Sequence, residues 1–193
     1  MSFLDYLPVL LAAIAAIALF SLKNGRWNIL ALSLQYVAVF WLVLGVWPVG
    51  LAAAKLVSGW MAGVILGGAI PEESVLQINQ QDQKETRFRV VLGLMIVLVS
   101  FVIAPGIATT IPGPVDILIG GTVLIGIGLL QLGMTADPLR IIFGLLTVLS
   151  GFEVFYAAIE NSLIVVGLLS MITLGIAFIG SFISNKHQEE TIL

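Results

Sequence analysis

Apolar residues in this chain come in long blocks that are separated by short polar or proline-containing segments. The blocks are about 20 residues long, the length that a helix needs to cross roughly 30 Å of hydrocarbon. Strands of a membrane barrel would instead alternate apolar and polar side chains over about ten residues. Because segments 9–18 and 91–99 carry no polar side chain at all, the pattern predicts transmembrane helices.

The breaks between the blocks divide the chain into seven predicted spans. Pro48 and Gly50 end one helix and start another, since proline and glycine interrupt helices. Asp137-Pro138 is typical of a helix start, because aspartate caps the first amides and proline suits the first turn. The expected spans are 3–22, 27–46, 51–70, 88–105, 115–134, 138–159 and 163–183.

A polar, glutamine-rich segment at 71–87 is the best candidate for a linker between two groups of helices. It predicts an N-terminal three-helix membrane unit at 1–70, a cytoplasmic linker at 71–87 and a C-terminal four-helix unit at 88–193. The predicted fold class is therefore an all-α polytopic membrane protein with about seven transmembrane helices.

The basic residues predict the orientation, because loops rich in lysine and arginine stay in the cytoplasm. In a seven-span arrangement all of them except Lys55 fall on one side of the membrane. This places the N-terminus outside and the C-terminus in the cytoplasm, and it predicts a multi-pass protein of the cell's inner (plasma) membrane. The residues on the cytoplasmic side are Lys23, Arg26, Lys84, Arg87, Arg89, Arg140 and Lys186.

Composition agrees with a lipid environment and limits the chemistry. The chain is 60% hydrophobic and 10% charged, with a mean hydropathy of +1.14, so it has too little polar surface for a water-soluble globule. There is no cysteine, and the only histidine is His187 in a polar tail. We therefore expect the lipid bilayer as a partner, no bound cofactor or metal, and no nucleic acid, since the net charge is only −3.

Two ionisable residues lie deep in predicted spans, where a charge is costly and usually marks an ion path or a buried pair. Glu153 is about 22 Å from the cytoplasmic end of its helix at 1.5 Å per residue, and Lys55 lies at nearly the same depth. The two side chains can therefore meet if their helices are neighbours. Alternatively, the Lys55 stem extends to the membrane boundary, and Glu153 is a neutral, hydrogen-bonded structural group.

Polar side chains continue along the helix from Glu153 toward the outer surface. Ser150, Glu153, Tyr156 and Glu160 recur in steps of three and four, so they share one face. This stripe is either a proton half-path or a structural patch that faces another subunit. The candidates for proton transfer are thus Glu153, Lys55, Glu160 and Tyr156.

Other residues at membrane depth indicate helix packing. Gly59, Gly63 and Gly67 recur every four residues and form a ridge that a second helix can approach closely. Gln35, near the middle of the second span, is expected to hydrogen-bond across helices. Phosphate-binding loops, nucleophile elbows and metal-ligand clusters are missing from the sequence, so we do not expect the chain to be catalytic alone.

The layout of a basic helical hairpin, a third helix with Lys55, a polar linker and a compact C-terminal unit resembles the hydrogenase-4 component E family. Its C-terminal unit, 115–184 here, is similar to subunit K of NADH:quinone oxidoreductase and of multisubunit cation/proton antiporters. The most similar stretch is Leu129 to Ala158, LLQLGMTADPLRIIFGLLTVLSGFEVFYAA. Within it, Pro138 to Gly144 matches the start of the second helix of that unit.

The resemblance implies a membrane-arm subunit of an ion-translocating complex related to respiratory complex I, membrane-bound hydrogenases or antiporters, with antiporter-like neighbouring subunits. The sequence departs from the family at Leu149, which matches the family's mid-helix glutamate, while Glu153 lies one turn further on. The seventh span also lacks the second glutamate of subunit K. Two alternatives remain, namely an accessory scaffold of another membrane complex and a small independent transporter.

Overall fold

A computed structural model describes residues 6–22, 24–70 and 80–192, with side chains placed except at 80–82 and 185–192. Throughout these residues the regular structure is helical and contains no strand. This confirms the predicted all-α fold of about seven helices. The helices are α1 (Leu7–Ser21), α2 (Gly25–Val43), α3 (Val49–Gly67), α4 (Gln80–Ile107), α5 (Val115–Gly133), α6 (Pro138–Ile159) and α7 (Leu163–Ile192).

Six of these helices, α2 to α7, are long and apolar enough to cross a membrane, while α1 has 15 described residues and is shorter. The expected first span began at Phe3, so part of it lies outside the described residues. The helix starts follow local capping chemistry. The side chain of Asn24 accepts a hydrogen bond from the Arg26 amide at the start of α2, and Asp137 does the same for Leu139 at the start of α6.

Two helices extend beyond the apolar blocks that predicted them. Helix α4 begins at Gln80, eight residues before the expected span, so the last part of the predicted 71–87 linker is helical. An ion pair between Glu85 and Arg89 joins successive turns there, with 2.8 Å between the charged atoms, and such pairs support a helix in water. Residues 71–79 of the linker lie outside the described residues. Helix α7 likewise continues past the expected end at Ile183.

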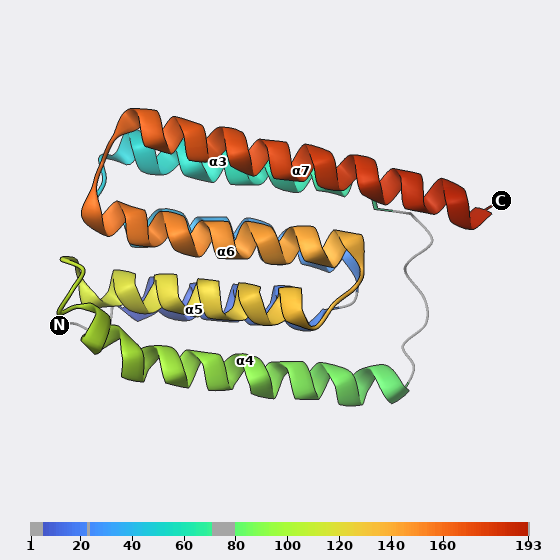
Figure 1. The fold of residues 1–193 in the computed structure, drawn as a ribbon, viewed down its shortest axis with the longest axis horizontal. Coiled ribbons are helices and arrows are strands. Elements are labelled where there is room, and N and C mark those ends of the chain that lie inside the picture. Colours follow the sequence, from blue (N-terminus) through green and yellow to red (C-terminus); the bar gives the residue numbers. More distant parts are fainter. Residues whose placement is uncertain (1–5, 23, 71–79, 193) are drawn as a thin grey trace.

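The helices form two stacked layers with an additional helix at one edge (Figure 1). Helices α1, α2 and α3 are neighbours in one layer, and α5, α6 and α7 are neighbours in the other. Across the layers α1 packs on α5, α2 on α6 and α3 on α7, while α4 contacts α1 and α5. The two predicted membrane units are therefore packed against each other along their helices.

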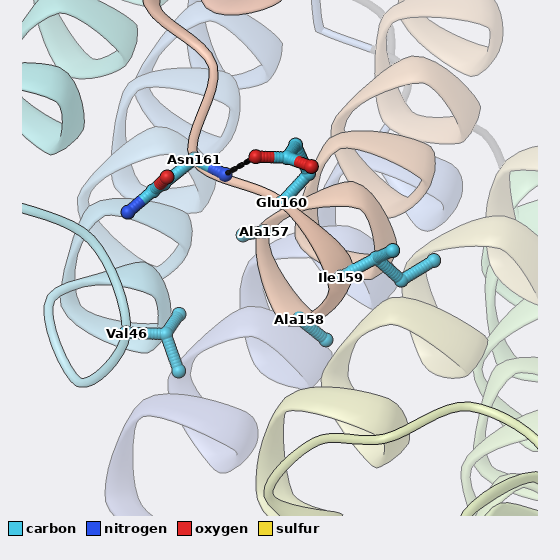
Figure 2. A pocket seen from close by; sticks show the side chains of 6 residues that line it. All are labelled: Val46, Ala157, Ala158, Ile159, Glu160 and Asn161. Atoms are coloured by element: carbon cyan, nitrogen blue, oxygen red, sulfur yellow. Dashed lines mark hydrogen bonds between the residues drawn. The ribbon is translucent and has the colours of Figure 1, made fainter.

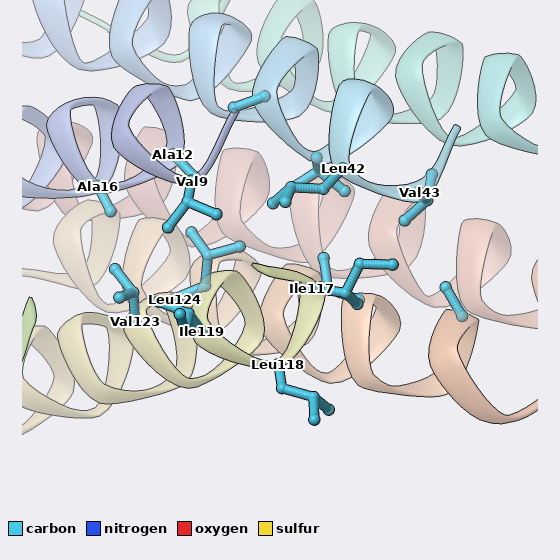
Figure 3. Packing of buried hydrophobic residues seen from close by; sticks show 14 of the residues in the cluster. Val9, Ala12, Ala16, Leu42, Val43, Ile117, Leu118, Ile119, Val123 and Leu124 are labelled. Atoms are coloured by element: carbon cyan, nitrogen blue, oxygen red, sulfur yellow. The ribbon is translucent and has the colours of Figure 1, made fainter. Parts of the chain in front are cut away.

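The larger apolar core lies between α1, α2 and α5 (Figure 3). Small residues such as Ala12 and Ala16 of α1 are fully buried there, so the helices can approach closely. Gly120 of α5 serves the same purpose, because a Cβ at this position would lie 2.7 Å from a methyl carbon of Leu42 in α2. Close packing of this kind replaces the hydrophobic effect, which is absent between helices in lipid.

The starts of α2, α4 and α6 lie at one end of the bundle, which we call the arginine end because Arg26, Arg87, Arg89 and Arg140 are there. Two of these side chains bind the C-terminal carbonyls of α1. Arg89 donates to the Phe20 carbonyl at 3.2 Å, and Arg140 donates to the Leu22 carbonyl at 2.6 Å. The last carbonyl groups of a helix attract cations. These two contacts therefore stabilise the C-terminal end of α1. The arginine end is the predicted cytoplasmic side.

Candidate functional site

An ion pair lies in the interior of the bundle, between Lys55 of α3 and Glu153 of α6. The Lys55 ammonium hydrogen-bonds Oε1 of Glu153, and their side chains are only 1% and 2% exposed. The main neighbours of α3 are α2 and α7, so Lys55 reaches α6 diagonally across the two layers. A long side chain is needed for this contact. Of the two expectations for Lys55, the structure shows the pairing with Glu153 and not an extension to the membrane boundary.

Hydroxyl groups from three helices surround the pair. The Thr173 hydroxyl of α7 lies 3.5 Å from Glu153 Oε1, and it also donates to the Leu169 carbonyl at 2.9 Å. The Ser150 hydroxyl of α6 donates to the Leu146 carbonyl at 2.8 Å. Tyr36 of α2 is fully buried beside Glu153, Ser150 and Thr173. The site is therefore built at the meeting point of α2, α3, α6 and α7.

Two polar atoms of this site are buried without a regular hydrogen bond in the described part of the chain. They are Oε2 of Glu153 and the hydroxyl oxygen of Tyr36. Buried polar atoms are nearly always satisfied by protein or by ordered water, because an unsatisfied one costs about 1 to 3 kcal/mol. Oε2 is thus the atom of the pair that remains free to take a proton or a water molecule.

A second polar contact lies about two turns closer to the arginine end. Thr147 of α6 donates to Oε1 of Gln35 in α2 at 3.3 Å, and both residues are fully buried. Gln35 therefore makes the type of interhelical hydrogen bond that its depth predicted. Its Nε2 group has no hydrogen-bond partner among the described residues.

Tyr156 and Glu160 lie further along α6 and do not join the ion pair. Glu160 is exposed at the end of α6, where its backbone carbonyl accepts a hydrogen bond from the Trp47 indole at 3.0 Å. Tyr156 packs edge-on against Trp47, with ring centroids 6.4 Å apart. These contacts hold the loop after α2 against the end of α6.

An open pocket is found beside this contact (Figure 2). It lies at the end of the bundle opposite the arginine end, and Ala157 is its innermost residue along α6, one helical turn from Glu153. Of the stripe predicted on α6, Glu160 alone is among the lining residues, and the apolar Ala157 lies between Glu153 and Glu160 along the helix. The lining residues are Val46, Ala157, Ala158, Ile159, Glu160 and Asn161.

The glycine ridge of α3 faces α2 and makes room for part of the site. A Cβ at Gly59 would lie 2.1 Å from the Tyr36 ring, so only glycine allows that ring to lie where it does. Near Gly63 and Gly67 the closest side chains include Ile29 of α2, at 3.7 and 3.1 Å from such a Cβ. The ridge thus packs α3 on α2, and at Gly59 it also positions Tyr36 beside Glu153.

Sequence reasoning missed Tyr36, Thr147 and Thr173 as members of the site. Single hydroxyl residues in apolar helices are common, because they can bond a carbonyl of their own helix. Thr147 lies three residues before Ser150 and thus extends the predicted stripe on α6 by one step, while Tyr36 directly follows Gln35. The signal that was present is the match in depth between Gln35 and Thr147, since each is about 14 to 15 Å from the start of its helix.

Groups of acidic residues or histidine that would suit a metal ion are not found in the part of the chain that the structure describes. No family model matches the chain, and no curated protein or solved structure matches it significantly.

Proposed function

We propose that this protein is a membrane-arm subunit of an ion-translocating, energy-converting complex, in which the Lys55–Glu153 pair takes part in proton movement. The observation that carries the proposal is the position of the pair. Both charges are deep in the bundle, and one carboxylate oxygen has no partner among the described residues. Intramembrane charges are costly, and they commonly mark proton relays.

The pair has chemically accessible states that differ in charge. A proton moving from the Lys55 ammonium to Oε1 of Glu153 converts two charges into two neutral groups. A proton arriving on Oε2 leaves the pair with a single positive charge on Lys55. Because charges interact strongly in a low-dielectric interior, a charge change in a neighbouring subunit would shift the balance between these states.

The resemblance to the hydrogenase-4 component E family supports the placement in a complex I-like, hydrogenase-like or antiporter-like assembly. The outward faces of α4 and α7 are strongly apolar, with Val102 80% and Ile164 81% exposed. Such faces contact lipid, and they also suit neighbouring membrane subunits.

Purification of the tagged protein from its native membrane in a mild detergent tests the assembly. We expect mass spectrometry to find antiporter-like and iron–sulfur subunits in the purified material. Recovery of this chain alone, or with unrelated membrane proteins, would contradict membership of an energy-converting complex. A chaotropic wash distinguishes stable partners from proteins that only share the micelle.

Glu153→Gln tests the proton role and has a matched control in Glu160→Gln. Glutamine keeps the size of the side chain and one oxygen that can accept from Lys55, but it has no charge and cannot carry a proton. We therefore expect proton translocation per assembled complex to fall at least tenfold, a barrier increase of about 1.4 kcal/mol. Glu160 is exposed just after the end of α6, two turns away, and does not join the ion pair, so its replacement should leave translocation unchanged. Proton uptake into sealed vesicles is the measurement, and unchanged uptake with Glu153→Gln would exclude a carrier role.

The same experiment separates the proposal from a second candidate, an accessory scaffold in which the pair only joins α3 to α6. The observation that favours the scaffold is the direct ion pair itself, which satisfies Oε1 of Glu153. A small independent transporter is less well supported, because helices broken at mid-membrane are typical of that class. Helices α3 and α6 run without interruption past Lys55 and Glu153.

A further inference from the structure

Buried polar atoms that have no hydrogen-bond partner in the described part of the chain lie on one side of the ion pair. All of them are found between the level of Glu153 and the arginine end. On the other side of Glu153, the buried residues of α6 are Val154 and Ala157, which are apolar. The six atoms are Ser21 Oγ, Asn28 Oδ1, Gln35 Nε2, Tyr36 Oη, Gln131 Oε1 and Glu153 Oε2.

Three of these residues follow one face of α2, which packs on α6. From the start of α2, Asn28 is about 5 Å along the helix and Gln35 about 15 Å, at 1.5 Å per residue. Tyr36 comes next, beside Glu153. The hydrogen bond from Thr147 to Gln35 ties α2 to α6 at the middle of this series. Asn28, Gln35 and Tyr36 therefore present unpaired polar atoms at successive depths along α2, and Gln35 and Tyr36 adjoin α6.

One apolar layer interrupts the series. Leu32 of α2 lies between Asn28 and Gln35, and it belongs to the same buried cluster as Phe143 and Leu146 of α6. All three side chains are fully buried. The layer is about one helical turn thick, so a short chain of water molecules would cross it only when the side chains separate. Apolar constrictions of this type gate conduction by excluding water.

We propose that protons reach Glu153 from the arginine end along the α2–α6 seam, through bound water held by Asn28, Gln35 and Tyr36 and gated by Leu32 and Phe143. Each water accepts one proton and passes another on, so the single proton that enters ends on Oε2 of Glu153. This path rests on the proposed function, because it supplies the proton that Glu153 would carry. It adds the direction of access and the gate.

Cysteine accessibility tests the path directly, because the natural chain has no cysteine. Thr147→Cys and Ser150→Cys place a thiol on the seam, and Val154→Cys places one on the far side of Glu153. Thr147 and Val154 form a matched pair, since both are fully buried on α6 and two turns apart on one face. The probe is Ag⁺, a small cation that reacts with thiols and enters only where water does.

Sealed vesicles of known orientation receive Ag⁺ on one side at a time, and mass spectrometry measures the unreacted thiol after denaturation and alkylation. From the arginine end, we expect the thiols at 147 and 150 to react at least about tenfold faster than the thiol at 154. Equal rates at the three positions, or faster reaction from the opposite end, would overturn the path. Ser150→Cys is nearly isosteric and keeps the test valid if Thr147→Cys does not fold.

The gate is tested in the Ser150→Cys background. Leu32→Ala shortens one side of the apolar layer, so we expect Ag⁺ to react about tenfold faster from the arginine end. Val39→Ala is the control, because Val39 is buried on the same helix two turns further from that end. An unchanged rate with Leu32→Ala would overturn the gate.

The accessibility experiment and the transport experiment can fail independently of each other. If Glu153→Gln leaves proton translocation intact while the thiols at 147 and 150 react as expected, the proposed function is wrong and the water path stands. If Glu153→Gln abolishes translocation while those thiols are protected from the arginine end, Glu153 carries protons by another route.

Discussion

Replacing Lys55 with methionine is expected to destabilise the folded bundle by about 3 to 5 kcal/mol, because it leaves the Glu153 carboxylate buried without its counter-charge. Methionine keeps most of the volume of the lysine side chain, so a packing defect contributes little. The measurement is the midpoint of unfolding in mixed detergent micelles, with the loss of helix monitored by circular dichroism. Lys84→Met is the control, because Lys84 is exposed near the start of α4.

The double substitution Lys55→Met with Glu153→Leu gives the more informative comparison. Exchanging a buried ion pair for apolar residues of similar size is often neutral or stabilising, by about 1 to 4 kcal/mol in known cases. We therefore expect the double variant to recover the stability that Lys55→Met loses. A double variant that is as unstable as the single one would show that the pair itself holds α3 and α6 together.

This comparison also bears on function. A protein that folds and assembles at least as well with two apolar residues has no structural need for the charges. Loss of proton translocation in a stable double variant would then assign the pair to transport. Full activity in that variant would show that the pair is needed neither for stability nor for transport.

The sequence alone predicted the number of helices and showed that Lys55 and Glu153 lie at a similar depth in them. Hydropathy predicts spans because a helix must cover the hydrocarbon thickness, and Lys55 and Glu153 stood out because charges are rare there. Hydropathy does not extend to polar helix ends, so the start of α4 at Gln80 and the continuation of α7 were missed. In α4 these turns carry a local ion pair, Glu85 with Arg89, which a hydropathy pattern does not register.

Helix neighbours were the part that the sequence could not predict. A helix with apolar residues all round gives no indication of which face meets protein and which meets lipid. The diagonal contact from α3 to α6 follows from stacking α3 on α7 and α2 on α6, and Tyr36 and Thr173 join the site only through that stacking. Lys55 and Glu153 lie at a similar depth, which limits the residues that could pair with each of them. Depth alone does not show which of those residues is the partner.

Among the glycines of α3, Gly59 has the least space for a larger side chain. We expect Gly59→Ala to destabilise the protein by about 1 to 3 kcal/mol, the usual cost of overpacking, because its Cβ would lie 2.1 Å from the ring of Tyr36. Gly63→Ala on the same face of α3 is the matched control. There a Cβ meets its nearest neighbours at 3.7 Å, an ordinary contact, and alanine favours the helix by about 0.5 to 1 kcal/mol.

The unfolding midpoints of Gly59→Ala and Gly63→Ala, measured side by side, test this expected difference in stability. Because Tyr36 packs between Gly59 and the ion pair, the clash should also displace its hydroxyl from Glu153. Adding Tyr36→Leu to Gly59→Ala removes the ring that causes the clash, so part of the lost stability should return. If Gly59→Ala were as stable as Gly63→Ala, Tyr36 would not occupy the space beside α3, and the site around Glu153 would have to be built without it.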